Sequence, residues 1–470
     1  MHKGISQGLQ YCLLCALITL FGAGNANSAP ILVFSSQGET PFDIVATNSQ
    51  GVQKYYIICI DSNEINVFGP PPTFPFITSI SVPGVKKGVY SPSRDLIYVY
   101  VYEEECSYIK AISNSTGQIL PYSYSTPMRI QGMDVDKDSG VLFSVLEDET
   151  WGKGWLVCHD PDNQLVPMSP PVECGRRPSG LLRGAIIPYV FINDYAYCQT
   201  EIEDGQGGFT DEGAIYCSVH VYNVSSLPPL KVCEVHVALN PGFMVLNSDE
   251  TRLYVTHSPP YDEDYVQSMS IIDTATLTSP EPLIEFVTIP NNGLCDPIVM
   301  GEGENEMLIA VTLPEHEGGG GTVETEVLYY NLMSSSYFIQ TEYNCPLFRL
   351  QRCIGWPFYL ATCPNDDLIL VINIDTVRPI CHITSPQGNF VGTVGQEINF
   401  SEHSDDNLSD ELVIQWDFTE NHTAEYIKSK PFEDSIASHS YDESGVYTAT
   451  LTVTDQGGNY CSDQIVITIV

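Results

Sequence analysis

Basic residues are scarce in this sequence. Its 470 residues include 19 Lys and Arg against 59 Asp and Glu, which gives a formal net charge of −40. Nucleic acids and anionic membranes bind cationic surfaces, so this balance excludes both as natural partners. It favours cations, basic proteins or a salty medium. The simplest alternative is an acidic surface that only keeps the protein in solution.

Long apolar runs are scarce as well. An apolar run of about ten residues, Tyr11–Phe21, follows Lys3 and precedes the small residues Gly22–Ala29. This is the pattern of a secretory signal peptide. We therefore expect residues 1–29 to be removed. No later stretch approaches about 18 continuous apolar residues, so the sequence predicts a secreted protein, extracellular or at the cell surface, without a membrane span.

Catalytic signatures are missing too. The sequence contains no His-Glu-x-x-His motif, phosphate loop or dinucleotide fingerprint, and its Gly-x-Ser-x-Gly, Gly4–Gly8, falls in the signal peptide. The ten histidines show no paired spacing. These absences favour a protein that binds over one that catalyses, although an enzyme that draws its site from several loops stays open.

Cysteine, in contrast, is plentiful. Of 15 cysteines, Cys12 and Cys15 leave with the signal peptide, and the remaining thirteen contain no Cys-x-x-Cys motif. In an exported chain this favours disulfides over metal or redox chemistry. Cys198 and Cys217 are equidistant from Gly207-Gly208, so a symmetric hairpin would place them opposite each other for a disulfide.

Strand-like apolar runs recur along the chain, each after a polar turn, as in DLIYVYVY, VLFSVLED, TRLYVTHS, EMLIAVTL and DLILVINI. The repeating units begin near Tyr55, Ile97, Leu142, Tyr195, Leu253, Leu308 and Ile369. Their spacing of 42 to 61 residues is typical of propeller blades. We therefore predict an all-β fold with a β-propeller over residues 30–376, in which seven blades are favoured and six or eight are alternatives.

The two ends of this region support a closed ring. The last unit, Phe358–Ile374, has room for two strands, and a lone strand, Ile31–Ser35, precedes the first unit. A terminal strand that completes the last blade would remove the open edges. The segment RLYVTHS…MSIIDTATLT resembles the YVTN-type propeller repeat, with Leu253–Thr256 on one strand and Ile272–Thr274 on the next; this resemblance implies architecture and no catalytic residues.

The C-terminal residues 378–470, which contain GTVGQEINFSEHSDD, IQWDFTEN and YTATLTVTD, resemble a PKD domain, an Ig-like β-sandwich of extracellular proteins. Trp416 and Phe418 alternate with Asp417 as core residues of a strand would. Where the family usually has Gly-Asp-Gly, this chain has Thr419–Asn421, so a longer loop is expected. Cys381 and Cys461 open the first and last predicted strands, which should be neighbours, so we predict a disulfide between them.

Acidic clusters follow the second predicted strand of successive units. Loops that join second to third strands emerge on one face of a propeller, so these clusters should form a ring there. The candidate ligand- or cation-binding face comprises Glu103, Glu104, Glu105, Glu147, Asp148, Glu149, Trp151, Trp155, Asp262, Glu263 and Asp264. Further acids at equivalent positions are Glu201, Glu203, Asp204, Glu315 and Glu317.

Two motifs near these clusters each have two interpretations. Asp134, Asp136 and Asp138 are spaced like calcium ligands, but the sequence lacks the glycine and closing glutamate of an EF-hand, so an ordinary turn is the alternative. Trp151 and Trp155 flank Gly152-Lys153-Gly154 and would meet across a hairpin. The alternative for them is a stacking platform for a sugar.

Together these features predict a secreted or cell-surface recognition or scaffold protein that binds protein, polysaccharide or cations through an acidic propeller face. Ca²⁺ is the candidate ion. The alternative is a secreted metal-assisted hydrolase or a lactonase-type propeller enzyme that uses the same face. Sequons for glycosylation, relevant if the source modifies asparagine, occur at Asn114, Asn223, Asn399, Asn407 and Asn421.

Overall fold

A computed structural model of the chain divides it into two compact units, one formed by Leu32–Ile372 and the other containing Asn373–Val470. The structure describes residues 32–470 except 72, 149–151, 195–201, 204–208, 211–216, 239, 258–267, 290–292, 301–305, 314–324, 333–334, 336, 344–346, 354–357, 374–378, 406–411, 419–425, 431–435 and 455–459. No helix in the described part is both long enough and apolar enough to cross a membrane.

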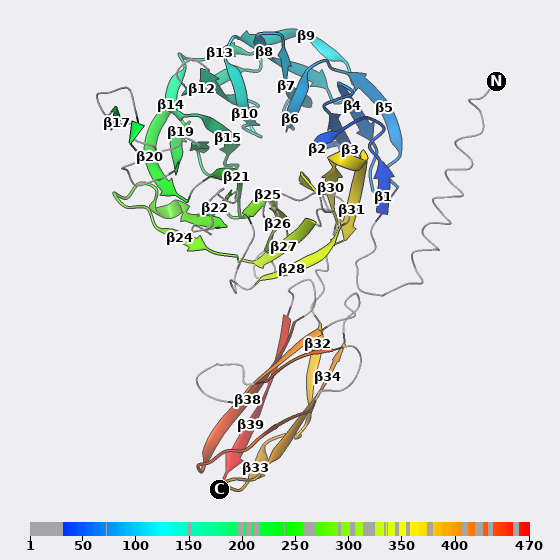
Figure 1. Cartoon of the computed structure of the whole chain (residues 1–470), viewed down its shortest axis with the longest axis vertical. Helices are drawn as coiled ribbons and strands as arrows, with labels where there is room; N and C mark the ends of the chain where they lie inside the picture. The colour runs from blue at the N-terminus through cyan, green and yellow to red at the C-terminus, as the bar shows by residue number, and fades with distance from the viewer. Residues whose placement is uncertain are drawn as a thin grey trace, which may run out of the picture. The chain divides into compact units, whose positions relative to one another are not determined.

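The first unit contains seven blades, each an antiparallel sheet, in a ring (Figure 1). Blade one is β2 (Pro41–Ser49), β3 (Val52–Cys59), β4 (Glu64–Phe68) and β5 (Phe76–Ser81). Blade two is β6 (Val85–Ser91), β7 (Leu96–Glu103), β8 (Cys106–Ser113) and β9 (Ile119–Thr126). Blade three is β10 (Arg129–Val135), β11 (Leu142–Asp148), β12 (Lys153–Asp160), β13 (Val166–Pro167) and β14 (Val172–Arg176).

Blades four to seven continue this order. Blade four is β15 (Pro178–Arg183), β16 (Tyr189–Asp194), β19 (Cys217–Asn223) and β20 (Leu230–Val237), with a separate pair β17 (Ile202–Glu203) and β18 (Phe209–Thr210). Blade five is β21 (Pro241–Leu246), β22 (Arg252–His257), β23 (Met269–Asp273) and β24 (Ile284–Val287). Blade six is β25 (Gly293–Met300), β26 (Met307–Leu313), β27 (Thr325–Asn331) and β28 (Tyr337–Tyr343). Blade seven is β29 (Leu350–Arg352), β30 (Phe358–Cys363), β31 (Leu368–Asn373) and β1 (Leu32–Ser35).

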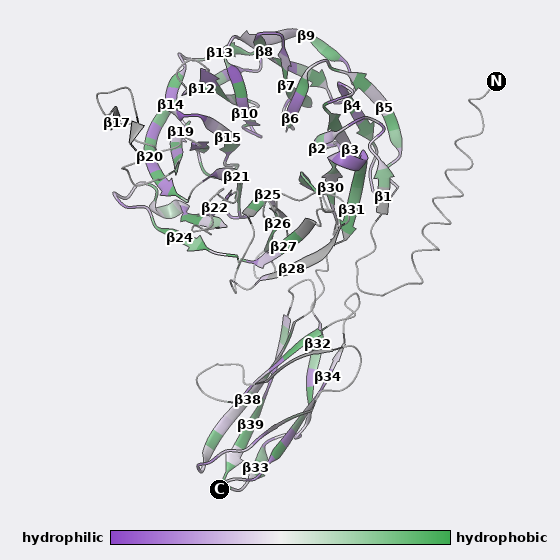
Figure 2. Ribbon diagram, in the orientation of Figure 1, coloured by the Kyte–Doolittle hydropathy of each residue, from purple (hydrophilic) through white to green (hydrophobic). Residues whose placement is uncertain are grey.

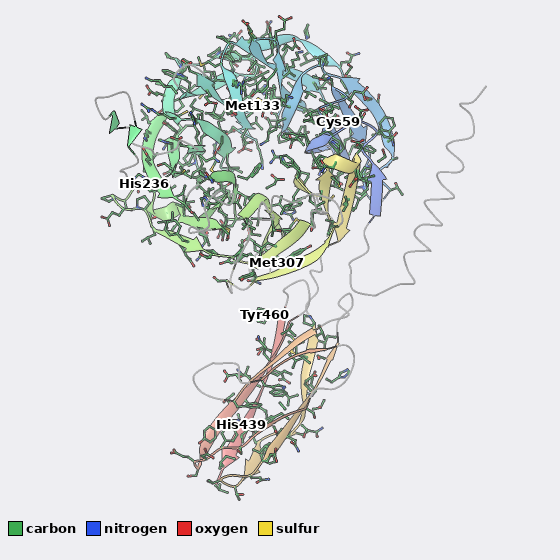
Figure 3. The ribbon with its side chains drawn as sticks, viewed as in Figure 1. Cys59, Met133, His236, Met307, His439 and Tyr460 are labelled. Atoms are coloured by element: carbon green, nitrogen blue, oxygen red, sulfur yellow. A yellow bond between two sulfur atoms is a disulfide. The ribbon has the colours of Figure 1, made fainter. Side chains whose placement is uncertain are left out.

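The first strand of each blade is the innermost one. Figure 1 shows β2, β6, β10, β15, β21 and β25 around the middle of the ring, and Figure 3 shows Met133 of β10 on the inner side and His236 of β20 on the outer side. Each first strand contacts the first strand of the next blade, and β29 contacts β2. Seven blades therefore close the ring, as favoured from the sequence.

Burial on both faces explains why the second strands are continuously apolar. Core clusters lie between neighbouring blades: Tyr56 and Ile58 of blade one pack with Val99 and Val101 of blade two, for example. A strand covered by a blade on each side needs apolar residues at odd and even positions. Figure 2 shows green, hydrophobic stretches alternating with purple ones on the blades. The outer strand β5 keeps most of its side chains exposed.

Strand β1 confirms the predicted closure. It pairs antiparallel with β31, with Leu32 opposite Val371 and Ser35 opposite Leu368. The segment from Phe358 holds two strands, β30 and β31, as expected. The expected start of the last unit was wrong, because β29 precedes it and Ile369 lies on the third strand rather than the second. Tyr195 lies outside the described residues, directly after β16.

The C-terminal unit is a β-sandwich. One sheet contains β32 (Ile380–Ser385), β34 (Ile398–Asp405) and β37 (Ile436–His439). The other contains β33 (Phe390–Gly392), β39 (Tyr460–Ile469), β38 (Gly445–Thr454), β35 (Leu412–Asp417) and β36 (Tyr426–Lys430). Its core includes Phe400, Trp416 and Phe418, and the rings of Trp416 and Phe418 stack at 5.8 Å.

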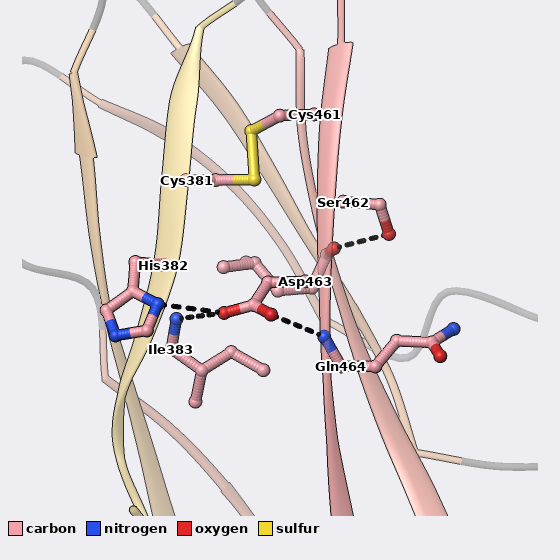
Figure 4. Close-up of a disulfide and its surroundings, with 8 residues drawn as sticks. Cys381, His382, Ile383, Cys461, Ser462, Asp463 and Gln464 are labelled. Carbon is pink, nitrogen blue, oxygen red and sulfur yellow. Dashed lines mark hydrogen bonds and ion pairs between the residues drawn. A yellow bond between two sulfur atoms is a disulfide. The ribbon is translucent and has the colours of Figure 1, made fainter.

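A disulfide joins the two sheets of the sandwich between Cys381 and Cys461, the pair named from the sequence (Figure 4). Next to it, Asp463 Oδ2 accepts hydrogen bonds from Ile383 N at 2.8 Å and from His382 Nδ1 at 3.1 Å. These contacts tie the first strand of the sandwich to the last. The loop residues Thr419–Asn421 lie outside the described residues.

Candidate functional site

The β7–β8 turn carries the best described of the predicted acidic clusters. Glu103 ends β7 opposite Cys106, which begins β8, so Glu104 and Glu105 form a two-residue hairpin tip. Glu104 adopts φ +56°, the left-handed backbone such a tight turn uses. Glu103 forms an ion pair with Lys110. Glu104 and Glu105 are exposed, and neither has a hydrogen-bond or ion-pair partner among the described residues.

The β11–β12 turn differs from the symmetric hairpin predicted for it. In the strand register, Asp148 lies opposite Lys153 and Leu146 lies opposite Trp155. Trp155 therefore does not face Trp151 across the strands. Trp155 is half-buried and packs into the core between blades two and three. The predicted facing of the two indoles is therefore wrong, because Leu146 lies opposite Trp155. The sugar platform stays a prediction.

The other predicted members of this face are not described. Glu147 Oε2 accepts a hydrogen bond from Gln131 Nε2, whereas Glu149, Trp151, Asp262, Glu263 and Asp264 lie outside the described residues, as do Glu201, Asp204, Glu315 and Glu317. Cys198 lies outside them too, so its bond with Cys217 stays a prediction.

Two acids at turns between first and second strands join neighbouring blades. Glu250 of blade five accepts hydrogen bonds from the backbone of blade four, from Ala185 N, from Ile186 N at 2.8 Å and from Ile187 N at 2.9 Å. Glu306 of blade six accepts one from Ser248 N of blade five at 2.6 Å. These acids are buried acceptors, and the fold requires them.

Two of the three proposed calcium ligands, Asp134 and Asp136, also contact a neighbouring blade. Asp134 accepts backbone hydrogen bonds from Val135 and Arg183, both at 2.8 Å. Asp136 Oδ2 pairs with the Arg183 guanidinium at 2.7 Å, and Asp136 Oδ1 accepts from Ser139. Asp138 is exposed and donates its own N–H to Asp136. Because Asp136 binds the Arg183 guanidinium, we withdraw the calcium site. The alternative interpretation, an ordinary turn between β10 and β11, is retained.

A cavity of about 270 Å³ lies beside this ion pair, lined by Asp136, Arg183 and the apolar residues Phe143 and Leu227, among others. Its two charged lining residues bind each other. Burial opposes ionisation of Asp136, but its bonds to Ser139 and Arg183 hold its pKa below the ordinary value. The cavity therefore offers no unengaged charge to a ligand.

Glycosylation at Asn114 is excluded by its position. Asn114 is 2 % exposed. Its Oδ1 accepts from Tyr56 at 2.8 Å and Thr47 at 3.1 Å, and its Nδ2 donates to Asp95 at 2.6 Å. An amide engaged at both ends inside a blade junction has no room for a glycan. Asn399 is exposed and Asn223 half-buried, whereas Asn407 and Asn421 lie outside the described residues.

A polar cluster at the axis of the ring was not predicted. We call Asp43, Lys87, Asp296 and Arg349 the axial cluster. Arg349, before β29, lies between Asp296, with which it pairs through Nη1, and Asp43, whose Oδ1 is 3.3 Å from Nε. Its guanidinium also lies 4.8 Å from the ring centre of Phe243. Arg349 of blade seven thus joins blades one, five and six.

Burial sets the electrostatics of the axial cluster. It raises the pKa of Asp296, which Arg349 partly offsets. Burial also opposes the charge on Arg349, but Asp296 and Asp43 hold the pKa of Arg349 above its ordinary value. In the strand register, Asp43 lies opposite Ile58 and Lys87 lies opposite Tyr100. Ile58 and Tyr100 each lie in the last part of a second strand. The cluster therefore lies toward the end of the propeller that carries the second-to-third turns.

Comparison with known proteins separates the two units. No curated protein matches the chain. Residues 377–469 match the family described as PKD domain. The C-terminal sandwich is a PKD domain. The disulfide between Cys381 and Cys461 therefore joins the first and last strands of this PKD domain.

Two solved structures share the architecture of the first unit. Hydrazine synthase of Kuenenia stuttgartiensis has a TM-score of 0.52 at 12 % identity and covers 73 % of this chain and 98 % of that one. The Cps50 (Swd1) β-propeller domain of Myceliophteria thermophila has a TM-score of 0.52 at 7 % identity and covers 73 % and 100 %. At such identities the likeness shows the propeller fold alone, and the YVTN repeat type stays a prediction.

Proposed function

We propose that the chain is a secreted or cell-surface recognition protein that binds a basic protein segment or cations through the propeller face carrying the second-to-third turns. One observation carries this proposal. Glu250 and Glu306 at the first-to-second turns accept hydrogen bonds from neighbouring blades, whereas Glu104 and Glu105 are exposed and have no hydrogen-bond or ion-pair partner among the described residues. Charge that does not stabilise the fold is available to a partner.

Electrostatics decides what kind of partner suits this face. Exposed carboxylates in a chain of net charge −40 repel one another, and a cationic partner relieves that repulsion. Such a face would increase the association rate of a basic ligand more than it would slow dissociation. Polysaccharide is a less favoured ligand, because Trp155, one of the two tryptophans proposed to stack on a sugar, packs into the core.

The second unit supports an extracellular setting. PKD domains are typical of extracellular and cell-surface proteins, where they act as spacers or contact proteins and polysaccharide. The Cys381–Cys461 disulfide suits an oxidising compartment. Together with the expected signal peptide, these features support recognition outside the cell.

A lysine-rich peptide on a sensor surface tests the proposal. The variant Glu104→Gln/Glu105→Gln should bind it with a lower association rate at low salt, by about three- to tenfold, and the difference should shrink as salt rises. The matched control Asp442→Asn/Glu443→Gln removes two exposed charges from the PKD domain and should leave the rate unchanged. Equal loss in both variants would contradict a dedicated face, and stoichiometric transition metal in purified protein would favour the enzyme alternative.

A further inference from the structure

The cavity beside the Asp136–Arg183 ion pair lies between blades three and four and opens to solvent. Its volume is about 270 Å³, and most of the residues that line it are apolar. Phe143 of β11 is buried, whereas Ser139, Ser225 and Leu227 are exposed, so the lining runs from the surface into the junction of the two blades. An engineered apolar cavity of about 150 Å³ holds benzene. This cavity therefore has room for a substituted aromatic ring.

The guanidinium of Arg183 keeps one donor for a ligand. Its side chain is 9 % exposed. Nη1 donates to Gly184 O and to Ile187 O, and Nη2 donates to Asp136 Oδ2 at 2.7 Å. Nε has no hydrogen-bond partner among the described residues. Since buried N–H groups are nearly always paired, Nε is a donor to which an acceptor oxygen of a ligand would be well matched.

The carboxylate of Asp136 supplies the complementary acceptor. Its Oδ1 accepts from Ser139 N and Ser139 Oγ, both at 2.8 Å, whereas its Oδ2 accepts from Arg183 alone within the described part of the chain. Nε and Nη2 donate toward the same edge of the planar guanidinium. Because Oδ2 binds Nη2, it lies next to the unused Nε donor. One end of the cavity thus presents a donor and an acceptor side by side.

We propose that this cavity binds a small neutral phenol, whose ring packs on the apolar lining and whose hydroxyl bridges Arg183 Nε and Asp136 Oδ2. A hydroxyl oxygen can accept from Nε and donate to Oδ2 at once, whereas a ketone only accepts and an ammonium group only donates. An aromatic ring also packs favourably against the ring of Phe143. A carboxylate ligand is disfavoured, because Asp136 and the net charge of −40 repel it.

The phenol site is separate from the acidic face. Ser139 belongs to the first-to-second turn of blade three, and Leu227 to the third-to-fourth turn of blade four. In an antiparallel blade, both kinds of turn emerge at the end opposite to the second-to-third turns, where Glu104 and Glu105 lie. Either proposal can therefore fail without the other.

An NMR titration of the mature full-length protein with p-cresol tests the inference. p-Cresol should bind saturably at one site, about fivefold or more tightly than p-xylene, in which a methyl group replaces the hydroxyl. The anion 4-methylbenzoate should not displace p-cresol. The variant Glu104→Gln/Glu105→Gln should bind p-cresol as the parent does. Equal affinity for p-cresol and p-xylene, or no binding of p-cresol, would overturn the inference.

Variants of exposed residues locate the site. Leu227→Ala removes part of the apolar lining and should weaken p-cresol binding about threefold. The matched control Leu230→Ala, an exposed position of β20 outside the lining, should leave the affinity unchanged. If Leu227→Ala does not fold, Ser225→Trp, which narrows the mouth from an exposed position, should reduce binding in its place. Unchanged affinity in the lining variant, or an equal loss in Leu230→Ala, would contradict the site.

Discussion

The two ends of the propeller use their acidic residues for different purposes. At the first-to-second turns, Glu250 and Glu306 are buried and accept backbone hydrogen bonds from the neighbouring blade. At the β7–β8 turn of the other end, Glu104 and Glu105 face solvent without partners among the described residues. A net charge of −40 therefore does not by itself identify a binding face. A binding face is identified by acidic side chains that form no hydrogen bond or ion pair within the fold.

The largest expected effect comes from the axial cluster, which joins the blades near the end of the propeller that carries the exposed acids. Arg349→Met would leave Asp43 and Asp296 buried without their cation. Removing one partner of a buried ion pair costs about 3–5 kcal/mol, so urea unfolding should show a loss of that size. Arg352→Met, an exposed change on β29, is the control. Similar stability of both variants would mean that the ring closes without Arg349.

Glu250 tests the inter-blade contacts of the first-to-second turns. Glu250→Ala removes the acceptor for three backbone N–H groups of blade four. Leaving buried donors unsatisfied should reduce the free energy of unfolding by about 2 kcal/mol. Glu285→Ala, at an exposed position of β24, should change it by less than about 0.5 kcal/mol. If both variants lose the same free energy of unfolding, the hydrogen bonds accepted by Glu250 do not stabilise the fold more than an exposed acid does.

The Asp136 carboxylate should make the free energy of unfolding depend on pH. Its folded-state pKa lies below the ordinary 3.8, so its carboxylate contributes stability above that pH, and this contribution is lost as the pH falls through the lowered value. Asp136→Asn should therefore cost about 1 kcal/mol at pH 7, after allowance for partial exposure, and nearly nothing at the acid end of the titration. Urea midpoints across this range measure it. Asp138→Asn, in the same turn and exposed, should show no such trend.

The fold could largely be predicted from the sequence because its signals are local. A second strand covered on both faces is a continuous apolar run, as in Leu96–Glu103, and the spacing of such runs indicates the number of blades. The closing strand Leu32–Ser35 and the pairing of Cys381 with Cys461 could be inferred from strands that need neighbours.

The axial cluster could not be predicted, since its partners come from other blades. The first-strand aspartates Asp43, Asp134 and Asp296 each accept a backbone N–H from the next blade, but this recurrence is visible only once the blades are aligned in space. Local symmetry also misled: Trp151 and Trp155 are symmetric about Lys153 in sequence, whereas the register pairs Lys153 with Asp148.

The smallest and most direct effect concerns the exposed acids themselves. Thermal unfolding of Glu104→Gln/Glu105→Gln at low salt, with and without added calcium, tests whether these charges are surplus to the fold. Removing like charges from one rim should raise the melting temperature slightly above that of the parent, and should reduce the stabilisation gained from calcium. Asp442→Asn/Glu443→Gln should change neither. A melting temperature below that of the parent, or identical behaviour of the control, would contradict an acidic face reserved for binding.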